Sequence, residues 1–336
     1  MDKAHRWTDR QVDKMGNHLA TVYSKQQKAV VLALDGINGR FGDELDKLYA
    51  AIENAENDQQ KARAKAEYLA FYRVRILRDK KVKALFAEIA DELYRANAGF
   101  NDYINGFASA IYAENYNAIS AEIAQQVDGF TVHKASEKVV EKVGAVEMHK
   151  RTLNKRKDTS WNKDNLQQSI LTGAALGLAK KALTKRTAAV VVKKNINVSN
   201  TAILAVATGA ENRGRLDAGE RASDEGYPVK KQWIATLDNR TRPSHVRLDG
   251  EKVGVDGEFL PGLSYPRDPR ADPEEVSGCR CSLKMDVGQR QGEERSAREG
   301  TVTGPYGLEE SFAGTKTVRV SNMTYEEWAE WRKKQP

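Results

Sequence analysis

Helix-forming residues without proline fill the first half of this chain. Residues 1–150 contain no proline and are rich in Ala, Glu, Lys and Leu, the composition that long helices need. Apolar residues recur there at steps of three and four, which predicts helices over residues 19–34, 58–97 and 101–126. We interpret these stripes as core packing between helices rather than as a cofactor-binding or membrane surface.

The texture of the sequence changes after Gly226. Before it, two more helices are predicted over residues 165–193 and 200–223, on either side of the Asn-rich sequence NINVSN. After it, prolines, glycines and short β-prone runs replace the helical pattern, so a domain boundary is expected there. Three runs predict the strands of a small sheet: KQWIATL (231–237), EKVGVDGEFL (251–260) and CSLKM (281–285).

These patterns predict an α+β chain that is mainly α. An elongated helical N-terminal region (residues 1–150) is expected to precede a basic linker (151–165). A small α+β domain with a short sheet (166–286) and an extended C-terminal arm (287–336) should follow.

The arm itself divides into two parts. Residues 287–314 are rich in Gly, Glu, Arg and Ser, which predicts a flexible strap. The last 20 residues predict a short strand and a terminal short helix that Thr324 can cap. Trp328 and Trp331 lie three residues apart on one face of that helix, which we expect to pack onto the chain's own sheet or onto a neighbouring subunit.

Composition narrows the class of protein. The 336 residues include 54 Lys and Arg against 47 Asp and Glu, giving a net charge of +7, so an anionic partner would be attracted. No run of about 18–20 apolar residues is present, and the first residues lack an apolar signal core, so we expect no membrane span and synthesis in the cytoplasm. The two cysteines, Cys279 and Cys281, lie too close in sequence for a disulfide-stapled scaffold.

Positive charge clusters between residues 150 and 165. Six Lys and Arg residues occur in this stretch, where the apolar pattern is interrupted. Such a run is typical of a solvated linker, and it can also bind a phosphate backbone by displacing condensed counterions. Lys155, Arg156 and Lys157 are therefore the candidates for contact with double-stranded DNA.

A group of unusual residues follows the domain boundary. The block begins with Trp233, Thr236 and Asp238, continues through two arginines and a histidine, and is followed by a Pro/Asp-rich loop and a Cys-Arg-Cys sequence. Its members are Trp233, Thr236, Asp238, Arg240, Arg242, His245, Leu248, Gly250, Phe259, Cys279, Arg280 and Cys281.

Over residues 200–286 this block resembles the phage head morphogenesis family of minor head proteins, which includes the Mu F-like and SPP1 gp7-like proteins. That family has a W-x-x-x-x-D-x-R-x-R-x-x-H-x-x-x-x-G block and, after a proline-containing loop, a C-R-C sequence. The preceding helix TGAENRGRLDAGERA is also similar, although Ala207-Thr208-Gly209 replaces the usual Arg-Thr-Glu.

The resemblance implies a capsid protein of the virion that takes part in head morphogenesis and DNA packaging. It would lie in the capsid interior or at the portal vertex, with the portal protein and other capsid or scaffolding proteins as partners and no catalytic function. Some relatives carry toxin domains, including ADP-ribosyltransferases, after the C-R-C sequence. About 50 residues follow it here, fewer than such a domain is expected to need.

The block also has a physical interpretation without the family. Asp238 lies in a predicted turn, where it can accept backbone hydrogen bonds and pair with Arg240 or Arg242 as a structural clamp. We therefore interpret Trp233, Arg240, Arg242 and Gly250 as residues that shape the fold.

His245, Cys279 and Cys281 offer three ligands of the kind that zinc prefers, and Asp238 or Asp249 could supply a fourth. The Cys-x-Cys spacing differs from the usual Cys-x-x-Cys of structural zinc sites. A cluster of small buried thiols with a hydrogen-bonded histidine is the alternative interpretation.

Two other functions are consistent with these residues. Asp238 and His245 are an acid and a base that a metal-dependent nuclease or hydrolase could use, although the sequence shows no nucleophile or phosphate-cradling loop beside them. A non-specific DNA-binding protein centred on residues 155–157 is the third hypothesis.

Overall fold

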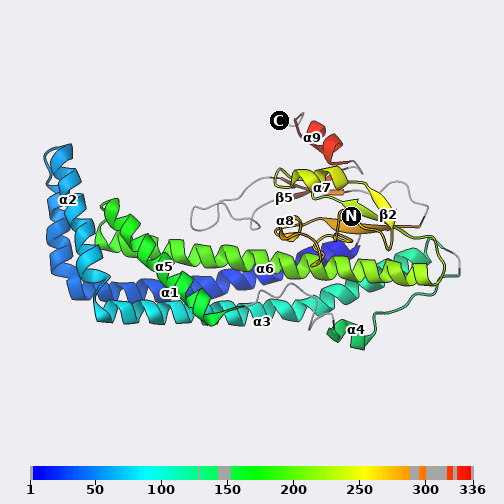
Figure 1. The fold of residues 1–336 in the computed structure, drawn as a ribbon, viewed down its shortest axis with the longest axis horizontal. Coiled ribbons are helices and arrows are strands. Elements are labelled where there is room, and N and C mark those ends of the chain that lie inside the picture. Colours follow the sequence, from blue (N-terminus) through cyan, green and yellow to red (C-terminus); the bar gives the residue numbers. More distant parts are fainter. Residues whose placement is uncertain are drawn as a thin grey trace. The chain divides into compact units, whose positions relative to one another are not determined.

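A computed structural model describes residues 3–127, 129–142, 153–287, 295–299, 316–320 and 324–333. Contacts divide the chain into two compact units. Unit 1 comprises residues 1–17, 101–151 and 200–336, and unit 2 comprises residues 18–100 and 152–199. Three long helices, α1 (Lys3–Glu53), α3 (Lys80–Ala124) and α6 (Lys180–Asp224), each begin in one unit and end in the other (Figure 1).

Unit 2 consists of helices, as the periodicity predicts. Besides its parts of the three long helices, it contains α2 (Asp58–Phe71), the π-helical turn η1 (Tyr72–Ile76) and α5 (Lys155–Ala175). The helix predicted over residues 58–97 is interrupted, because Asp79 accepts hydrogen bonds from the backbone amides of Lys81 and Val82 and so begins α3.

Most of the predicted apolar stripe of α1 is buried, including Leu19, Tyr23, Val30 and Leu34. Leu32 is the exception, with 76% of its surface exposed. Leu32 falls within the range predicted as an apolar stripe, but it lies on the solvent-exposed face of the helix.

A chain of buried polar side chains joins four helices of unit 2, namely α1, α3, α6 and α5. Tyr23 on α1 donates to Asn97 on α3, and Asn97 donates to Asn195 on α6 over 2.7 Å. Asn195 in turn donates to Asn162 on α5 over 2.8 Å. Because each amide must meet its partner, this chain fixes the register of the helices.

Two sequence predictions in unit 2 are corrected by this packing. The Asn-rich sequence at 195–200 is not a break, since α6 continues through it and the Asn195 amide bonds both Asn162 and the carbonyl of Val191. The predicted linker is helical from Lys155, because Asn154 caps α5 by accepting from the Lys157 amide. Tertiary and capping hydrogen bonds outweigh weak local propensity at both places.

Unit 1 contains a small antiparallel sheet in the order β2-β1-β3, which confirms the short sheet predicted from the sequence. Lys231 and Trp233 of the central strand β1 are both buried. The elements of this unit, besides the long helices, are α4 (Glu137–Lys142), β1 (Lys230–Ile234), α7 (Pro243–Leu248), β2 (Lys252–Gly254), α8 (Pro273–Val276), β3 (Ser282–Asp286), β4 (Arg295–Glu299), β5 (Lys316–Val320) and α9 (Tyr325–Lys333).

Helix α6 lies close to its neighbours in unit 1. A Cβ atom at Gly214 would come within 2.4 Å of the carbonyl oxygen of Tyr112 on α3, and one at Gly219 within 2.6 Å of Met285 Sδ on β3. The approach at Gly214 requires glycine because the neighbouring atom is backbone, whereas at Gly219 the flexible Met285 side chain can move. This part of α6 is thus in direct contact with α3 and with the sheet.

The described residues of the C-terminal arm include a strand where the sequence predicts a flexible strap. Residues 295–299 lie within the predicted flexible strap, yet they form β4 and pair with β5. Helix α9 packs on its own chain, since Trp328 is buried against Leu237 and the hydroxyl of Tyr325 donates to the carbonyl of Asp238 over 2.7 Å.

Within the described residues, no helix is both long and apolar enough to cross a membrane. The predicted domain boundaries at residues 150, 165 and 286 stay predictions.

Candidate metal centre

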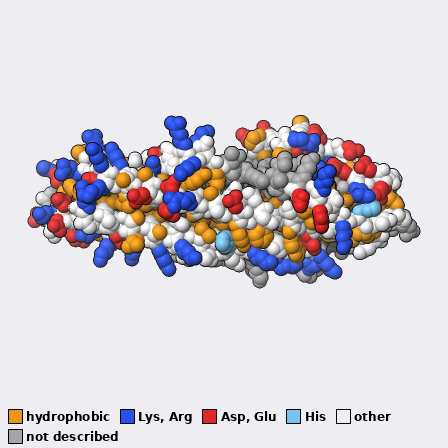
Figure 2. All heavy atoms as spheres, turned by 90° about the horizontal axis from the view of Figure 1, so that it is seen from below, with side chains coloured by type: hydrophobic (Ala, Val, Ile, Leu, Met, Phe, Trp, Pro, Cys, Tyr) orange, Lys and Arg blue, Asp and Glu red, His pale blue; other side chains and the backbone are white. Residues whose placement is uncertain are grey.

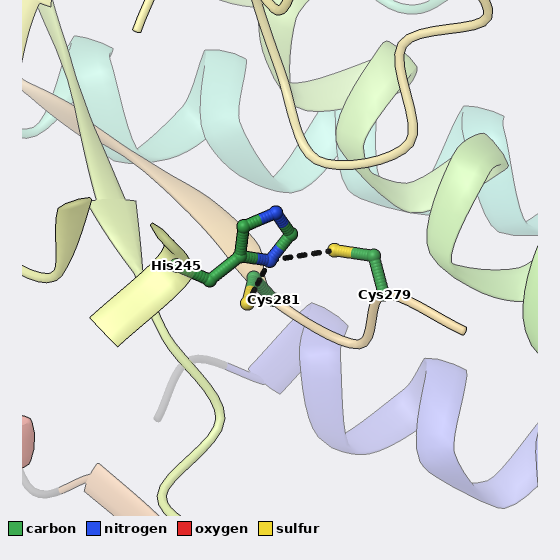
Figure 3. A group of neighbouring side chains, drawn as sticks. All are labelled: His245, Cys279 and Cys281. Carbon is green, nitrogen blue, oxygen red and sulfur yellow. Dashed lines mark hydrogen bonds between the residues drawn. The ribbon is translucent and has the colours of Figure 1, made fainter. Parts of the chain in front are cut away.

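Three donor side chains of unit 1 converge in its interior. His245 lies on α7, and Cys279 and Cys281 lie just before β3. Both sulfurs face the same ring nitrogen, with Nδ1 of His245 at 3.6 Å from Cys279 Sγ and 3.5 Å from Cys281 Sγ (Figure 3). Their ligand atoms all lie within 4.8 Å of one another, and each residue is at most 3% exposed.

This spacing fits a tetrahedral zinc ion. Zinc bonds of about 2.3 Å to sulfur and about 2.05 Å to nitrogen, at a tetrahedral angle, place the two ligand atoms about 3.6 Å apart. Both sulfur–nitrogen distances are close to that value. The cysteines form no disulfide, so both thiols are available as ligands. His245, Cys279 and Cys281 could therefore hold a metal ion such as zinc.

Helix α6 holds the Cys-Arg-Cys segment in place. The side-chain amide of Asn212 donates to the carbonyl of Cys281 over 3.1 Å and accepts from the backbone amide of Leu283 over 2.7 Å. Arg215, one turn along, donates to the carbonyl of Leu283 over 2.9 Å. These contacts satisfy the edge of β3 and fix where the two sulfurs lie.

The electrostatic environment distinguishes the two thiols. Burial raises the pKa of Cys279, but hydrogen bonds from Cys281 and the nearby Arg267 and Arg242 outweigh it and bring the pKa to about 7. Burial and the neighbouring Cys279 raise the pKa of Cys281. The arginines near Cys279 favour its thiolate, which is the form that binds a metal.

Asp238 lies outside this group of donors. Both of its oxygens are held by the guanidinium of Arg280, one of them over 2.8 Å, and Arg240 approaches to 3.8 Å. Burial raises the pKa of this carboxyl, but the hydrogen bonds from Arg280 outweigh it and leave the pKa below its usual value. The clamp expected from the sequence is therefore present, with Arg280 as the main partner instead of Arg240 or Arg242.

The alternative fourth ligand, Asp249, is also engaged elsewhere. It accepts from the backbone amides of Ala235 and Tyr325, each over 2.7 Å. The structure thus brings together three of the predicted ligands and directs both carboxylates to other partners.

The chain resembles known proteins over the region that contains this cluster. The profile of the family described as "Phage Mu protein F like protein" matches residues 163–284, which include all three donors. Residues 163–284 form a Phage Mu protein F-like domain. We call this segment the Mu F-like domain.

Two curated proteins share shorter stretches with this chain. One is the NAD(+)–arginine ADP-ribosyltransferase EFV of Enterococcus faecalis (strain ATCC 700802 / V583), 41% identical over 66 residues, which are 19% of this chain and 13% of that protein. The other is the uncharacterized protein YqbB of Bacillus subtilis (strain 168), 38% identical over 80 residues, covering 20% of this chain and 26% of YqbB. No solved structure matches this chain.

The other predicted residues of the Mu F-like domain shape the surroundings of the cluster. The indole of Trp233 is fully buried and meets the ring of His245 edge to face, with centroids 4.9 Å apart. Arg242 donates to the carbonyl of Ser277, and Gly250, at φ +84°, donates its amide to the carbonyl of Trp233 over 2.9 Å.

Several residues that contact the cluster were not singled out as site residues by sequence reasoning. Arg267, at a positive φ of 69°, donates to the carbonyl of Cys279 over 2.9 Å. Glu275 on α8 lies 3.0 Å from Nε2 of His245. Asn212 lies in the helix that resembles the family, and Arg280 lies between the two cysteines, so their sequence context was a usable signal.

The burial of the cluster limits its chemistry. A polymer substrate has no access to side chains that are at most 3% exposed, so a nuclease centred on His245 is not supported by this conformation. A base that faces two thiols and is enclosed by the fold is typical of a structural metal site or a buried polar cluster.

The candidate DNA-binding residues lie in unit 2, at the first turn of α5. All three are exposed, and Lys155 forms an ion pair with Asp91 over 3.1 Å. Unit 2 contains 24 Lys and Arg against 14 Asp and Glu, a net charge of +10. Figure 2 shows many Lys and Arg side chains standing out from the end of the view that holds α2.

Proposed function

We propose that this chain is a minor head protein that acts in phage head morphogenesis near the portal vertex. The observation that carries the proposal is the Mu F-like domain at residues 163–284. Its partners would be the portal protein and other capsid or scaffolding proteins, and its place the virion. The buried cluster supports a structural and interaction role, because its donors are enclosed by the fold rather than presented to a substrate.

Within this role, the cluster would be a structural zinc site. His245, Cys279 and Cys281 would bind the ion, which would cross-link α7 to the segment before β3. A small sheet of three short strands gains from such a cross-link, since metal-binding free energy becomes folding free energy. Bound zinc supplies only this cross-link.

Contact with packaged DNA is the part of the proposal that concerns unit 2. Residues 152–199 contain 10 Lys and Arg against 2 Asp and Glu. Three of the ten, Lys155, Arg156 and Lys157, stand in the first turn of α5, where the helix dipole disfavours cations. A phosphate backbone beside this turn would offset that cost.

The head role is tested in particles of a phage that encodes this chain. Mass spectrometry should find the chain in purified virions at a low copy number, and the purified chain should retain that phage's portal protein in a pull-down. The Asn212→Leu variant lacks the hydrogen bonds to Cys281 and Leu283 and should retain less portal protein. The control is Arg221→Gln, a change at an exposed residue of the same helix, which should retain more. Absence from virions together with no retention of portal protein would contradict the proposal.

A further inference from the structure

Glu275 connects the candidate zinc ligand His245 to the surface of the Mu F-like domain. It lies on α8, four residues before Cys279, and its side chain is 25% exposed. One of its carboxylate oxygens, Oε2, lies 3.0 Å from Nε2 of His245 and accepts a hydrogen bond from the hydroxyl of Ser244 over 2.8 Å. The pair of Nε2 and Oε2 is at ion-pair distance without hydrogen-bond alignment.

Both nitrogens of the His245 ring therefore have a defined environment. Nδ1 faces the two sulfurs at 3.5 and 3.6 Å, and Nε2 faces the carboxylate. A neutral imidazole carries one proton, and the neighbour of each nitrogen decides which one holds it. A carboxylate beside Nε2 favours the proton there, which leaves the lone pair of Nδ1 directed at the sulfurs.

The position of Glu275 is fixed by more than one contact. Asp272 caps the N-terminus of α8, since its side chain accepts from the Glu274 amide over 2.8 Å, and Arg242 donates to the carbonyl of Ser277 at the C-terminal cap. Ser244 holds the carboxylate itself. Helix α8 is thus tied to the start of α7 by two hydrogen bonds, one to the Glu275 side chain and one to its C-terminal cap. These contacts hold the Glu275 carboxylate beside His245.

We propose that Glu275 is a positioning residue of the metal site, which holds His245 as the Nε2-protonated tautomer so that Nδ1 is the metal ligand. The inference rests on the proposed zinc site and adds the residue that prepares its one nitrogen donor. Glu275 itself binds no metal in this arrangement. Its effect passes through His245, because a carboxylate held 3.0 Å from the second ring nitrogen influences the orientation and basicity of a ligating imidazole.

The test compares three variants of the full chain with the wild type. Glu275→Leu removes the carboxylate, Glu275→Gln removes its charge but keeps a side-chain oxygen, and Glu274→Leu changes the exposed neighbour as the matched control. The tautomer of His245 is read in metal-free protein by long-range ¹H–¹⁵N correlation, with the signals assigned from a His245→Gln sample. Zinc affinity is measured by competition with a chromophoric chelator, and near-ultraviolet circular dichroism checks that each variant is folded.

The wild type and Glu274→Leu should show a single Nε2-protonated tautomer and equal zinc affinity. Glu275→Leu should lose the single tautomer and bind zinc about 10–100-fold more weakly, with Glu275→Gln between the two. If Glu275→Leu does not fold, the Glu275→Gln result decides the question by the same two measurements.

Zinc binding and tautomer unchanged in both Glu275 variants would overturn the role of Glu275 and leave the metal site intact. A wild-type chain that binds no zinc would overturn the proposed metal site, and the positioning role with it.

Discussion

Unit 1 and unit 2 place their charges in opposite ways. Unit 2 has a net charge of +10 and unit 1, with 30 Lys and Arg against 33 Asp and Glu, has −3. Yet every buried charged side chain among the described residues belongs to unit 1, and the buried polar side chains of unit 2 are uncharged. Those of unit 1 are Glu211, Arg215, Lys231, Asp238, Arg267 and Asp268, besides His245.

The two units therefore differ both in the interactions that stabilise their interiors and in the charge on their surfaces. Buried charges are expensive unless they are paired, so unit 1 depends on a few specific partners around its sheet and its candidate metal site. Unit 2 is held by apolar stripes and an amide chain, and its excess charge stays on the surface, where a polyanion can reach it. Replacement of buried charged residues should therefore change the stability of unit 1 most. Replacement of surface charges should change the affinity of unit 2 for a polyanion.

Loss of Arg215 should have the largest effect. Its guanidinium is 2% exposed and contacts Asn115, Glu211 and the carbonyl of Leu283 at 2.9–3.1 Å. Arg215→Met should lower the free energy of unfolding of unit 1 by about 3–5 kcal/mol, since partners of a buried charge remain unpaired. Urea denaturation measures it, followed by the fluorescence of Trp233 in a background where the other four tryptophans are replaced by Phe.

The control lies two turns further along the same helix. Arg221 pairs with Glu225 over 3.0 Å at the surface, so Arg221→Met should change the free energy of unfolding by no more than about 0.5 kcal/mol. If both variants lowered the free energy of unfolding by similar amounts, the buried contacts of Arg215 would not contribute specifically to stability.

Removal of zinc should destabilise unit 1 and leave unit 2 unchanged. With free zinc at about 1,000 times its dissociation constant, binding contributes about 4 kcal/mol to the folded state, and a chelator removes that contribution. Hydrogen exchange should then accelerate in α7 and β3, with the amides of α5 as the internal control. An equal acceleration in α5 would contradict the assignment of the metal to unit 1.

Replacement of Lys231 should raise the free energy of unfolding, in contrast to replacement of Arg215, because Lys231 is a buried charge without a hydrogen-bond partner among the described residues. It is fully buried, its Nζ lies 5.8 Å from the ring centre of Phe259, and no hydrogen-bond partner is present among the described residues. Burial lowers the pKa of Lys231 from 10.5 to about 8, although nearby acidic residues, Glu220 first among them, raise it in part.

Because the folded state holds this proton less tightly than the unfolded state, stability should rise as pH increases from about 8 to 10.5. Lys231→Met should stabilise unit 1 by about 3 kcal/mol at pH 7 and remove that rise. Lys230→Met, at the exposed neighbouring position, is the control. Thermal unfolding across this pH range would reject the account if the two variants behaved alike.

The surface charge of unit 2 should affect its affinity for DNA and should not affect its free energy of unfolding. Arg156→Gln with Lys157→Gln should weaken binding to a 30-base-pair duplex and reduce the slope of log affinity against log salt by at most about 1.8, about 0.9 for each phosphate that is no longer neutralised. The matched pair in unit 1, Lys230→Gln with Arg247→Gln, should leave both the affinity and the slope unchanged. Fluorescence anisotropy at several salt concentrations measures the slope, and a salt-independent affinity would exclude a phosphate contact.

Sequence alone predicted the features of the fold that repeat along the chain. The stripe through Leu19 and Tyr23 and the small sheet around Trp233 follow from periodicity and β-propensity. The course of α6 through Asn195 could not be predicted, because it depends on Asn162, which lies 33 residues away in the sequence. Local propensity contains no information about such a partner.

The candidate site was predictable in part for the same reason. His245, Cys279 and Cys281 stand out as residue types that bind metals, and the family resemblance grouped them. Asp238 has the right chemistry for a ligand, but the guanidinium of Arg280 holds it, and Glu275 becomes visible only when α8 is placed beside α7. Which carboxylate approaches the imidazole is decided by packing rather than by spacing in the sequence.

The metal content of the chain is the sharpest test of the proposed zinc site. The protein should be purified without a metal-binding tag and its zinc measured by mass spectrometry, beside Cys279→Ser and the control Ser282→Ala, whose residue is half-buried at the start of β3. We expect about one zinc per chain in the wild type and in Ser282→Ala, and almost none in Cys279→Ser. A folded wild-type chain that contains no metal would contradict the account.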